Sequence, residues 1–256
     1  MRRREFTAGA VAGIAGLTAG KVAWDRLTPA GAARPALPDD ARMSFSQQGE
    51  DIVLFHAVRD LLKVERGTYM DVGAAHPIKA NNTYLMYGTG DRGLLVEPNP
   101  MFVKLLRSYR PRDIVLQAGI GVTDVAEADY YEIKDNPWLN TFSAETVERL
   151  QKGHASSVVE RVVKMPLVDI NRAISEHLGK APDLLSTDVE GLDYAILRAL
   201  DLHTFRPGVI CSEGVPMFAP DGRHSDIATY LLSQGYILRG GSMVNSIFVD
   251  ARRLSE

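Results

Sequence analysis

From about residue 43 onward, short apolar runs alternate with amphipathic segments, and this alternation limits the folds open to the chain. Runs such as "GLLVEPNP", "DLLSTDVEG" and "GVICSEG" are typical of buried strands, whereas "LDYAILRALDL" carries apolar residues at helical spacing. Strands separated by helices form a parallel sheet with helices on both faces. The last pattern, "YILRGGSMVNSIFVD", predicts two strands around a Gly-rich turn, and therefore an antiparallel pair at the C-terminal end.

The same patterns predict the remaining elements. "DIVLFHAVRDLLKV" is a first helix, with Ser46 as its N-cap and Glu50 and Asp51 in its first turn. "DIVLQAGIG" is one strand and "EADYYEI" an extra one, and "SDIATYLLSQG" is a helix capped by Ser225. We therefore expect an α/β domain whose sheet is mostly parallel.

Composition excludes several classes of protein. The chain has 256 residues, of which 45% are hydrophobic, enough for a full core without disulfides or metals. Its formal net charge is −3, so no overall field attracts nucleic acid, and we expect no nucleic-acid partner. The single cysteine, Cys211, lies in a predicted buried strand. No cysteine and histidine cluster has metal-ligand spacing, so we expect no metal site.

Residues 1–42 differ from the rest of the chain. Three arginines precede a Gly/Ala-rich apolar run, and Arg3–Phe6 resembles the core of a twin-arginine signal. The run from Phe6 to Gly20 is shorter than the roughly 20 apolar residues of a membrane-spanning helix. It fits a targeting signal or a shallow membrane anchor, with an amphipathic or disordered arm as the alternative. A Pro/Ala-rich linker follows, and we expect the folded domain to comprise residues 43–256.

Ligands of parallel α/β sheets bind at the carboxyl ends of the strands. That rule selects the strand ends and the loops after them: residues 71–76, 97–99, 119–121, 188–191 and Glu213. In "MDVGAA", Asp71 ends a strand, and small residues allow the backbone to approach a ligand closely. The G-x-G-x-x-G fingerprint of dinucleotide sites is absent, which favours a smaller nucleoside over a nicotinamide dinucleotide.

Acidic residues end two further predicted strands. Glu97 lies one strand–helix–strand unit after Asp71, where a carboxylate can accept hydrogen bonds from both hydroxyls of a ribose. Asp188 and Glu190 are two residues apart and share one face of a strand. Either could serve as a base, and a pair of carboxylates could bind a cation. For Glu190, capping of the next helix is an equally good interpretation.

Taken together, these segments resemble the FkbM family of methyltransferases over roughly residues 44–250. The pieces that carry the resemblance are "FSQQGEDIVL", "YMDVGAAHPIKANNTYLMY", "LLVEPNP", "MPLVDI", "LLSTDVEGLDYAILRAL" and "VICSEG". The resemblance implies a class I methyltransferase fold of Rossmann-like type and S-adenosylmethionine as cofactor. It also implies, as the usual reaction, O-methylation of a hydroxyl on a sugar, glycolipid or polyketide-type small molecule.

The resemblance further implies site residues. Those on the cofactor side would be Gln48, Glu50, Asp71, Gly73, Ala74, Asn82, Thr83, Glu97, Pro98 and Asn99. Among them, Glu97 would hold the ribose hydroxyls, while Asp188 and Glu190 would face the transferred methyl group. The acceptor hydroxyl must lose a proton, and Asp188 is our first candidate for that base or for a group that orients the acceptor. His76 is the second, because imidazole titrates near neutrality.

Two other functions remain open from the sequence: a membrane-tethered binding protein with a decayed methyltransferase domain, and a nicotinamide-dependent oxidoreductase. The expected partner is a small-molecule or glycan acceptor, with membrane association through the N-terminal segment. S-adenosylmethionine is a cytoplasmic cofactor, whereas the arginine-rich leader resembles an export signal. We expect a catalytic domain in the cytoplasm or at the cytoplasmic face of the membrane, with export as the alternative.

Overall fold

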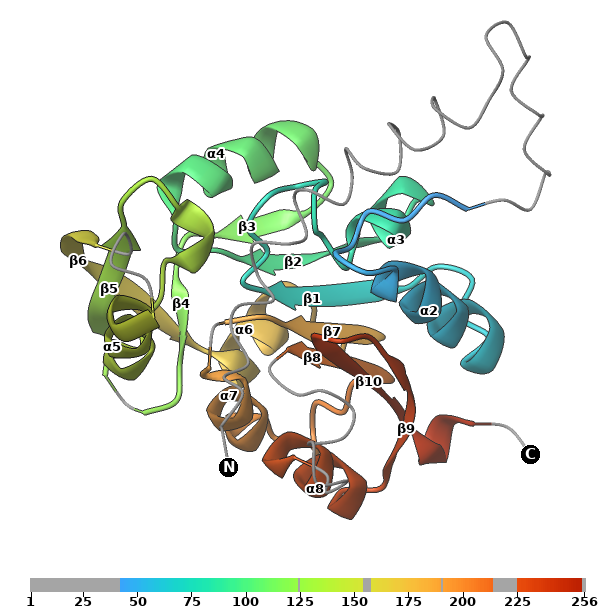
Figure 1. Ribbon diagram of the computed structural model, residues 1–256. Coiled ribbons are helices and arrows are strands. Elements are labelled where there is room, and N and C mark those ends of the chain that lie inside the picture. Colours follow the sequence, from blue (N-terminus) through green and yellow to red (C-terminus); the bar gives the residue numbers. More distant parts are fainter. Residues whose placement is uncertain (1–41, 124, 154–157, 190, 214–224, 255–256) are drawn as a thin grey trace, which may run out of the picture. The chain divides into compact units, whose positions relative to one another are not determined.

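The computed structural model describes residues 42–123, 125–153, 158–189, 191–213 and 225–254. Its centre is a seven-stranded sheet with the order β3-β2-β1-β7-β8-β10-β9 (Figure 1). The strands are β1 Thr68–Val72, β2 Arg92–Val96, β3 Ile114–Leu116, β7 Leu184–Thr187, β8 Val209–Glu213, β9 Tyr236–Gly241 and β10 Asn245–Asp250. All neighbours from β3 to β8 pair in parallel, and β10 is antiparallel to both β8 and β9. The predicted parallel sheet with a C-terminal antiparallel pair is confirmed.

Helices cover both faces of this sheet. One face packs against α2 Glu50–His56, the π-helical turn η1 Ala57–Leu61, α3 Tyr84–Gly88 and α4 Pro100–Tyr109. The other face packs against α6 Ile170–His177, α7 Asp193–Ala199 and α8 Asp226–Ser233. Side chains alternate between the two cores along each strand: in β1, Tyr69 faces α2 and α3, whereas Met70 and Val72 face α6 and α7. This alternation places Asp71 on the α2 and α3 side.

A second sheet, absent from the sequence-based expectation, has the strand order β4-β6-β5. Its strands are β4 Gly119–Gly121, β5 Glu127–Ile133 and β6 Val159–Asp169, with η2 Pro137–Leu139 and α5 Ala144–Gly153 between β5 and β6. The segment "DIVLQAGIG" was expected to be one strand, and this was wrong. It divides into β3 and β4, because β3 is the edge of the large sheet and the chain then pairs with β6. The extra strand "EADYYEI" is confirmed as β5.

The predicted helix caps had different outcomes. Ser225 caps α8, since its hydroxyl accepts a hydrogen bond from the backbone N–H of Ala228 (3.1 Å). Ser46 does not occupy the N-cap position of α2, which Gly49 takes with a φ of 94°. The Ser46 hydroxyl nevertheless accepts a hydrogen bond from the backbone N–H of Asp51 (3.2 Å), so it stabilises the helix start from outside the helix. The last helical element that the structure describes is the short turn η3 Ala251–Arg253.

The predictions for the N-terminal leader fall on residues 1–41, which lie outside the described residues. The targeting or anchoring role and the domain boundary near Met43 therefore stay predictions. Within the described part of the chain, no helix is both long enough and apolar enough to cross a bilayer.

Candidate functional site

Strand register brings the predicted strand-end residues into one row. Val72 of β1 is level with Val96 of β2 and with Thr187 of β7, and Thr187 is level with Ser212 of β8. The next residue of each strand lies at the same edge, in the order Glu97, Gly73, Asp188 and Glu213. Neighbouring strands are about 4.8 Å apart, so the two ends of this row are about 14 Å apart.

Gly73 occupies a position that only glycine can take. Its φ is +82°, in the left-handed region, and an added Cβ would lie 2.0 Å from the carbonyl oxygen of Asp188. Its N–H donates to the carbonyl of Val96 (2.9 Å), and the N–H of Asp188 donates to the carbonyl of Val72 (3.0 Å). The turns after β1 and β7 are therefore in backbone contact. The close approach of the two turns depends on the absence of a Cβ at residue 73.

Glu97 is a buried carboxylate, 4% exposed, beside this edge. Its Oε2 accepts a hydrogen bond from the N–H of Ala75 (2.8 Å), and its Oε1 accepts one from the N–H of Asn99 (2.7 Å). Burial raises the pKa of Glu97 to about 7, although these two N–H donors lower it, and nearby Asp71 raises it further. A carboxylate has about four lone-pair sites, so two remain for further donors such as the hydroxyls of a diol.

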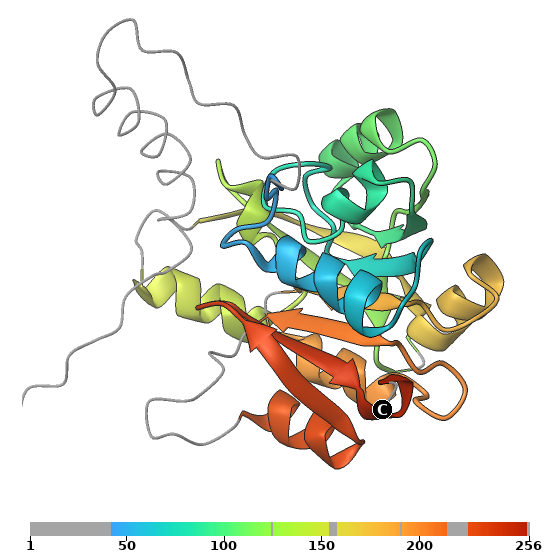
Figure 2. The ribbon, with the colours of Figure 1, turned by 90° about the vertical axis from the view of Figure 1, so that its right-hand side faces the viewer.

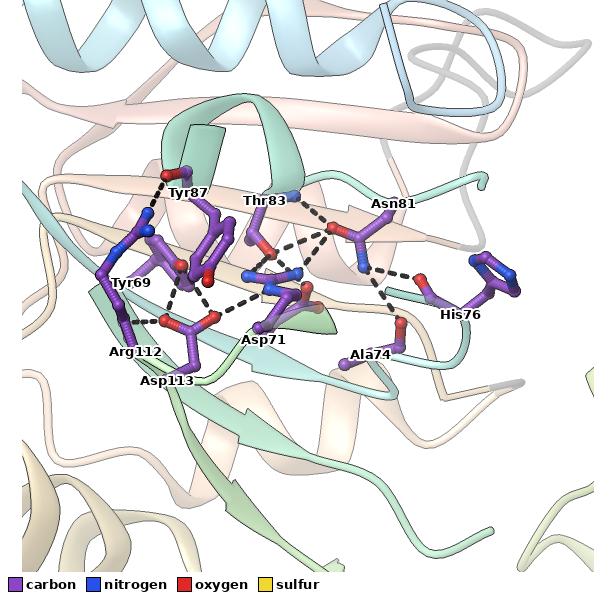
Figure 3. A network of polar contacts seen from close by, with 11 residues as sticks. Tyr69, Asp71, Ala74, His76, Asn81, Thr83, Tyr87, Arg112 and Asp113 are labelled. Carbon is purple, nitrogen blue, oxygen red and sulfur yellow. Dashed lines mark hydrogen bonds and ion pairs between the residues drawn. The ribbon is translucent and has the colours of Figure 1, made fainter. Parts of the chain in front are cut away.

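Asp71 and Thr83 lie beneath the edge, in a buried polar network (Figure 3). The Thr83 hydroxyl donates to Oδ2 of Asp71 (2.6 Å), and Nη2 of Arg110 donates to the Thr83 hydroxyl (2.9 Å). Burial raises the pKa of Asp71, although Arg110 lowers it. Both predicted cofactor ligands thus use their side chains to support the turn after β1, and direct contact with a cofactor stays a prediction.

Arg110 organises that network, a role that the sequence pattern did not predict. Its side chain is fully buried and donates to Oδ1 of Asn81 (3.0 Å) and Oδ2 of Asp113 (2.7 Å). The Asn81 amide in turn donates to the carbonyls of Ala74 (3.0 Å) and His76 (3.3 Å). The network therefore fixes the backbone of residues 74–76, which adjoins Glu97. A basic residue at the end of a helix gave no sign of this burial.

His76, the second predicted base, is engaged by its own loop. Its Nδ1 accepts hydrogen bonds from the N–H groups of Ile78 (3.1 Å) and Lys79 (3.0 Å). The neutral ring must then carry its proton on Nε2, which makes that nitrogen a donor. Burial, with a smaller effect of Lys79, lowers the pKa of His76. The ring also stacks on Trp138 (6.3 Å between centroids), so the geometry suits an orienting group better than a base.

Gln48 and Glu50 connect the N-terminal side of α2 to the turn between β9 and β10. Oε1 of Glu50 accepts hydrogen bonds from Oγ of Ser242 (2.6 Å) and Nδ2 of Asn245 (3.2 Å). Oε1 of Gln48 accepts one from the N–H of Met243 (2.9 Å). Figure 2 shows α2 (blue) beside the β9–β10 hairpin (red). Burial raises the pKa of Glu50, but the hydrogen bonds from the Ser242 hydroxyl and from the backbone of Gln48 lower it, and the net shift is downward.

The remaining predicted residues surround the row. Asn82 is half-buried and donates to Oγ of Ser186 (3.2 Å) under β7. Asn99 caps α4 by accepting a hydrogen bond from the N–H of Met101 (2.9 Å), and half-buried Pro98 lies between it and Glu97. Ala74 is buried in the turn after Gly73. Glu190 lies outside the described residues, and its role stays a prediction.

A cavity of about 260 Å³ opens at the β7 and β8 end of the row. Its lining includes Asp193, Tyr194, Glu213, Ser225, Asp226 and Ile227. Asp193 is 3% exposed, and among the described residues its Oδ1 has no hydrogen-bond partner. Burial raises the pKa of Asp193 to about 6, although the neighbouring Thr187 hydroxyl lowers it. In the sequence Asp193 is part of a predicted helix, although it is also the third carboxylate of "DVEGLD".

The sheet order, with its antiparallel last strand, and the binding edge at the ends of β1, β2 and β7 define a class I methyltransferase fold. A family model described as the methyltransferase FkbM domain matches residues 71–238. The chain belongs to this family. It is therefore a methyltransferase that uses S-adenosylmethionine.

No curated protein matches the chain. Among solved structures, it is similar to a TehB-like SAM-dependent methyltransferase from Corynebacterium glutamicum, with 10% identity, 93% of this chain and 99% of that chain covered, and a TM-score of 0.40. An O-methyltransferase from Bacillus cereus in complex with SAH shows 13% identity, coverage of 93% and 90%, and a TM-score of 0.36. A methyltransferase from Geobacter sulfurreducens shows 9% identity, coverage of 98% and 92%, and a TM-score of 0.42.

Proposed function

We propose that this methyltransferase transfers the methyl group of S-adenosylmethionine to a hydroxyl oxygen of a small, polyhydroxylated acceptor, such as a sugar, glycolipid or polyketide-type molecule. The observation that carries this proposal is the row at the carboxyl edge of the sheet. One end of the row holds a buried carboxylate suited to a ribose diol, and the other end holds carboxylates suited to an acceptor hydroxyl. The two ends are about 14 Å apart, so the nucleoside and acceptor subsites are separate.

The residues at the first end fit the cofactor. Glu97 has unused lone pairs for two hydroxyl donors. Its pKa is raised because its two backbone N–H donors do not compensate for the burial of the carboxylate. Gly73 lets the turns after β1 and β7 approach each other closely at this edge, where a Cβ would collide with the carbonyl oxygen of Asp188. Glu97, Gly73 and Ala74 would therefore hold the nucleoside side, with Pro98 and Asn99 beside the base. When bound, the cofactor supplies a methyl group already activated by a sulfonium.

The protein then has two tasks, to align the acceptor oxygen and to remove its proton. Asp188 follows β7 directly, is half-buried, and lies between Gly73 and Glu213 in the row. We assign it the orientation of the acceptor hydroxyl. His76, whose Nδ1 is occupied by two backbone N–H groups, is available as a donor at Nε2.

Calorimetry with S-adenosylhomocysteine and with NAD tests the cofactor side. We expect S-adenosylhomocysteine to bind and NAD to bind weakly or not at all. Glu97→Ala should weaken binding about ten- to a hundredfold, because charge-assisted hydrogen bonds to a diol are lost. A chain that binds neither compound would be a decayed domain, and one that prefers NAD would be an oxidoreductase.

The acceptor side is tested by incubating the protein with S-adenosylmethionine labelled in its methyl group and a small-molecule extract of the organism that carries the chain. The product is then analysed by NMR. We expect the label in a methyl group bonded to oxygen. Label found on nitrogen, carbon or sulfur would contradict O-methylation. We also propose that the catalytic domain works in the cytoplasm or at the cytoplasmic face of the membrane, which cell fractionation tests.

A further inference from the structure

The cavity at the ends of β7 and β8 contains a carboxylate oxygen with no partner among the described residues. Oδ1 of Asp193 is buried and makes no hydrogen bond there, and Asp193 lines the cavity. A buried polar atom without a partner costs about 1–3 kcal/mol, so such atoms need an explanation. A ligand hydroxyl in the cavity would donate the missing hydrogen bond.

The charge of the cavity indicates which ligand it takes. Its described lining carries the carboxylates of Asp193, Glu213 and Asp226, and none of those lining residues is Lys, Arg or His. Like charges would repel a phosphate or carboxylate group of a ligand. Hydroxyl groups, in contrast, can donate to these carboxylates, and Tyr194 and Ile227 offer apolar contact. The lining therefore disfavours an anionic ligand and suits a hydroxyl-bearing molecule.

The surroundings of Asp193 keep its carboxylate in place. The Thr187 hydroxyl, at the end of β7, lies close enough to lower the pKa of Asp193, and it donates a hydrogen bond to the hydroxyl of Ser212 (Oγ1 to Oγ, 3.0 Å). Both hydroxyls are buried. Glu213, at the end of β8, raises the pKa of Asp193, and Asp226 of α8 lines the same cavity. With burial, this raises the pKa of Asp193 to about 6, in the range of a useful base near neutral pH.

We propose that this cavity is the acceptor subsite, that it takes an uncharged polyhydroxylated group, and that Asp193 is the catalytic residue that receives the acceptor proton. This inference rests on the proposed function. As the acceptor oxygen forms its bond to the methyl carbon, its proton passes to Oδ1 of Asp193. The bond between that carbon and the cofactor sulfur breaks, and its electron pair stays on the sulfur. The sulfonium charge and the carboxylate charge are thereby both lost, and solvent later takes the proton.

The test measures the initial rate of methyl transfer against pH, with labelled S-adenosylmethionine and the same extract divided by ion exchange into neutral, cationic and anionic fractions. For the wild-type protein we expect label in the neutral fraction. The rate should rise tenfold per pH unit below about pH 6 and level off above it. Asp193→Asn should keep its affinity for S-adenosylhomocysteine but lose at least about a hundredfold in rate, together with the inflection.

Two further variants separate a chemical role from a structural one. Thr187→Val removes a neighbouring hydroxyl that lowers the pKa of Asp193, so the inflection should move to higher pH with the fold intact. Asp193→Glu keeps a carboxylate and should keep an inflection at reduced rate. Asp201→Asn, at an exposed aspartate, serves as the matched control and should change neither rate nor profile.

Each outcome is decisive. The inference is overturned if Asp193→Asn keeps the wild-type rate or inflection, or if label enters only the anionic fraction. If Asp193→Asn loses its fold by circular dichroism, an unchanged inflection in Thr187→Val overturns the inference and a shifted one supports it. If no fraction is labelled although S-adenosylhomocysteine binds, the proposed function itself fails and the inference fails with it.

Discussion

As the pH rises, the free energy of unfolding of the Glu97→Gln variant should increase relative to that of the wild-type protein. In the folded chain the pKa of Glu97 is about 7, against an ordinary value of 4.5, because the carboxylate is buried. The folded state therefore holds this proton more tightly than the unfolded state. The stability that Glu97 contributes is full below about pH 4.5 and is lost as the pH rises through 7.

The size of the effect follows from the shift in pKa. A difference of about 2.5 units at about 1.4 kcal/mol per unit gives about 3 kcal/mol between pH 4.5 and about pH 8. Glutamine does not titrate, so the wild-type free energy of unfolding minus that of Glu97→Gln should fall by this amount over the range. Glutamine also faces one of the two backbone N–H donors with its own NH₂ group, but that penalty does not depend on pH and cancels in the comparison.

The assay is urea unfolding without cofactor, followed by far-UV circular dichroism at several pH values. Glu65→Gln, at an exposed glutamate in the loop before β1, is the control and should follow wild type at every pH. If the free energies of wild type and Glu97→Gln stay parallel from pH 4.5 to about pH 8, Glu97 is not a carboxylate destabilised by burial. The assignment of this residue as one that lacks hydrogen-bond donors would then fail.

Three further substitutions test the rest of the site. Gly73→Ala combines a left-handed backbone with a collision against a carbonyl oxygen, so it should lower the free energy of unfolding in urea by more than about 2 kcal/mol. The control Gly49→Ala, with a φ of +94° and open space around it, should lower it by only about 1–2 kcal/mol. Equal losses would contradict the close approach at Gly73. Asp188→Asn should lower the rate of methyl transfer but leave the affinity for S-adenosylhomocysteine nearly unchanged by calorimetry; abolished binding with the fold intact would make Asp188 a cofactor ligand instead. Arg110→Met leaves buried carboxylates without their cation and should lower the free energy of unfolding in urea by about 3–5 kcal/mol. The control Arg172→Met, which breaks an exposed ion pair, should have a much smaller effect. Comparable losses would show that the Arg110 network is not structural.

The row of strand-end residues was predictable because each member lies at the end of a short, mostly apolar run. Glu97 follows "GLLV", and the buried strands align at Val72, Val96 and Thr187. Once those runs form parallel strands, the residues after them must share an edge. The fold class and the position of the binding edge therefore depend mainly on local pattern, which a single sequence contains.

Side-chain direction was less predictable, because it depends on distant partners. Asp71 alternates with Met70 and Val72, so it had to face the opposite core, but its partner Arg110 lies 39 positions further along the chain. In the sequence, Asp193 is a typical acidic residue in the first turn of a helix. It lines a cavity only because β8 and α8 bring Glu213 and Asp226 beside it.

The second sheet escaped prediction for a related reason. Residues 114–121 form a continuous pattern of apolar and small residues, and nothing within it marks the point where the chain leaves one sheet for another. That point is set by β6, more than 40 residues later, which pairs with β4 at Ile120 and Val168. Pairing between strands so far apart is a property of the whole fold.

A crystal structure of the protein with S-adenosylhomocysteine tests the central claim most directly. The account predicts the ligand at the carboxyl ends of β1, β2 and β7, with both ribose hydroxyls on the carboxylate of Glu97 and the sulfur at the Asp188 side of the row. It would be contradicted by a ligand bound elsewhere on the chain, or by one bound at this edge with its ribose away from Glu97.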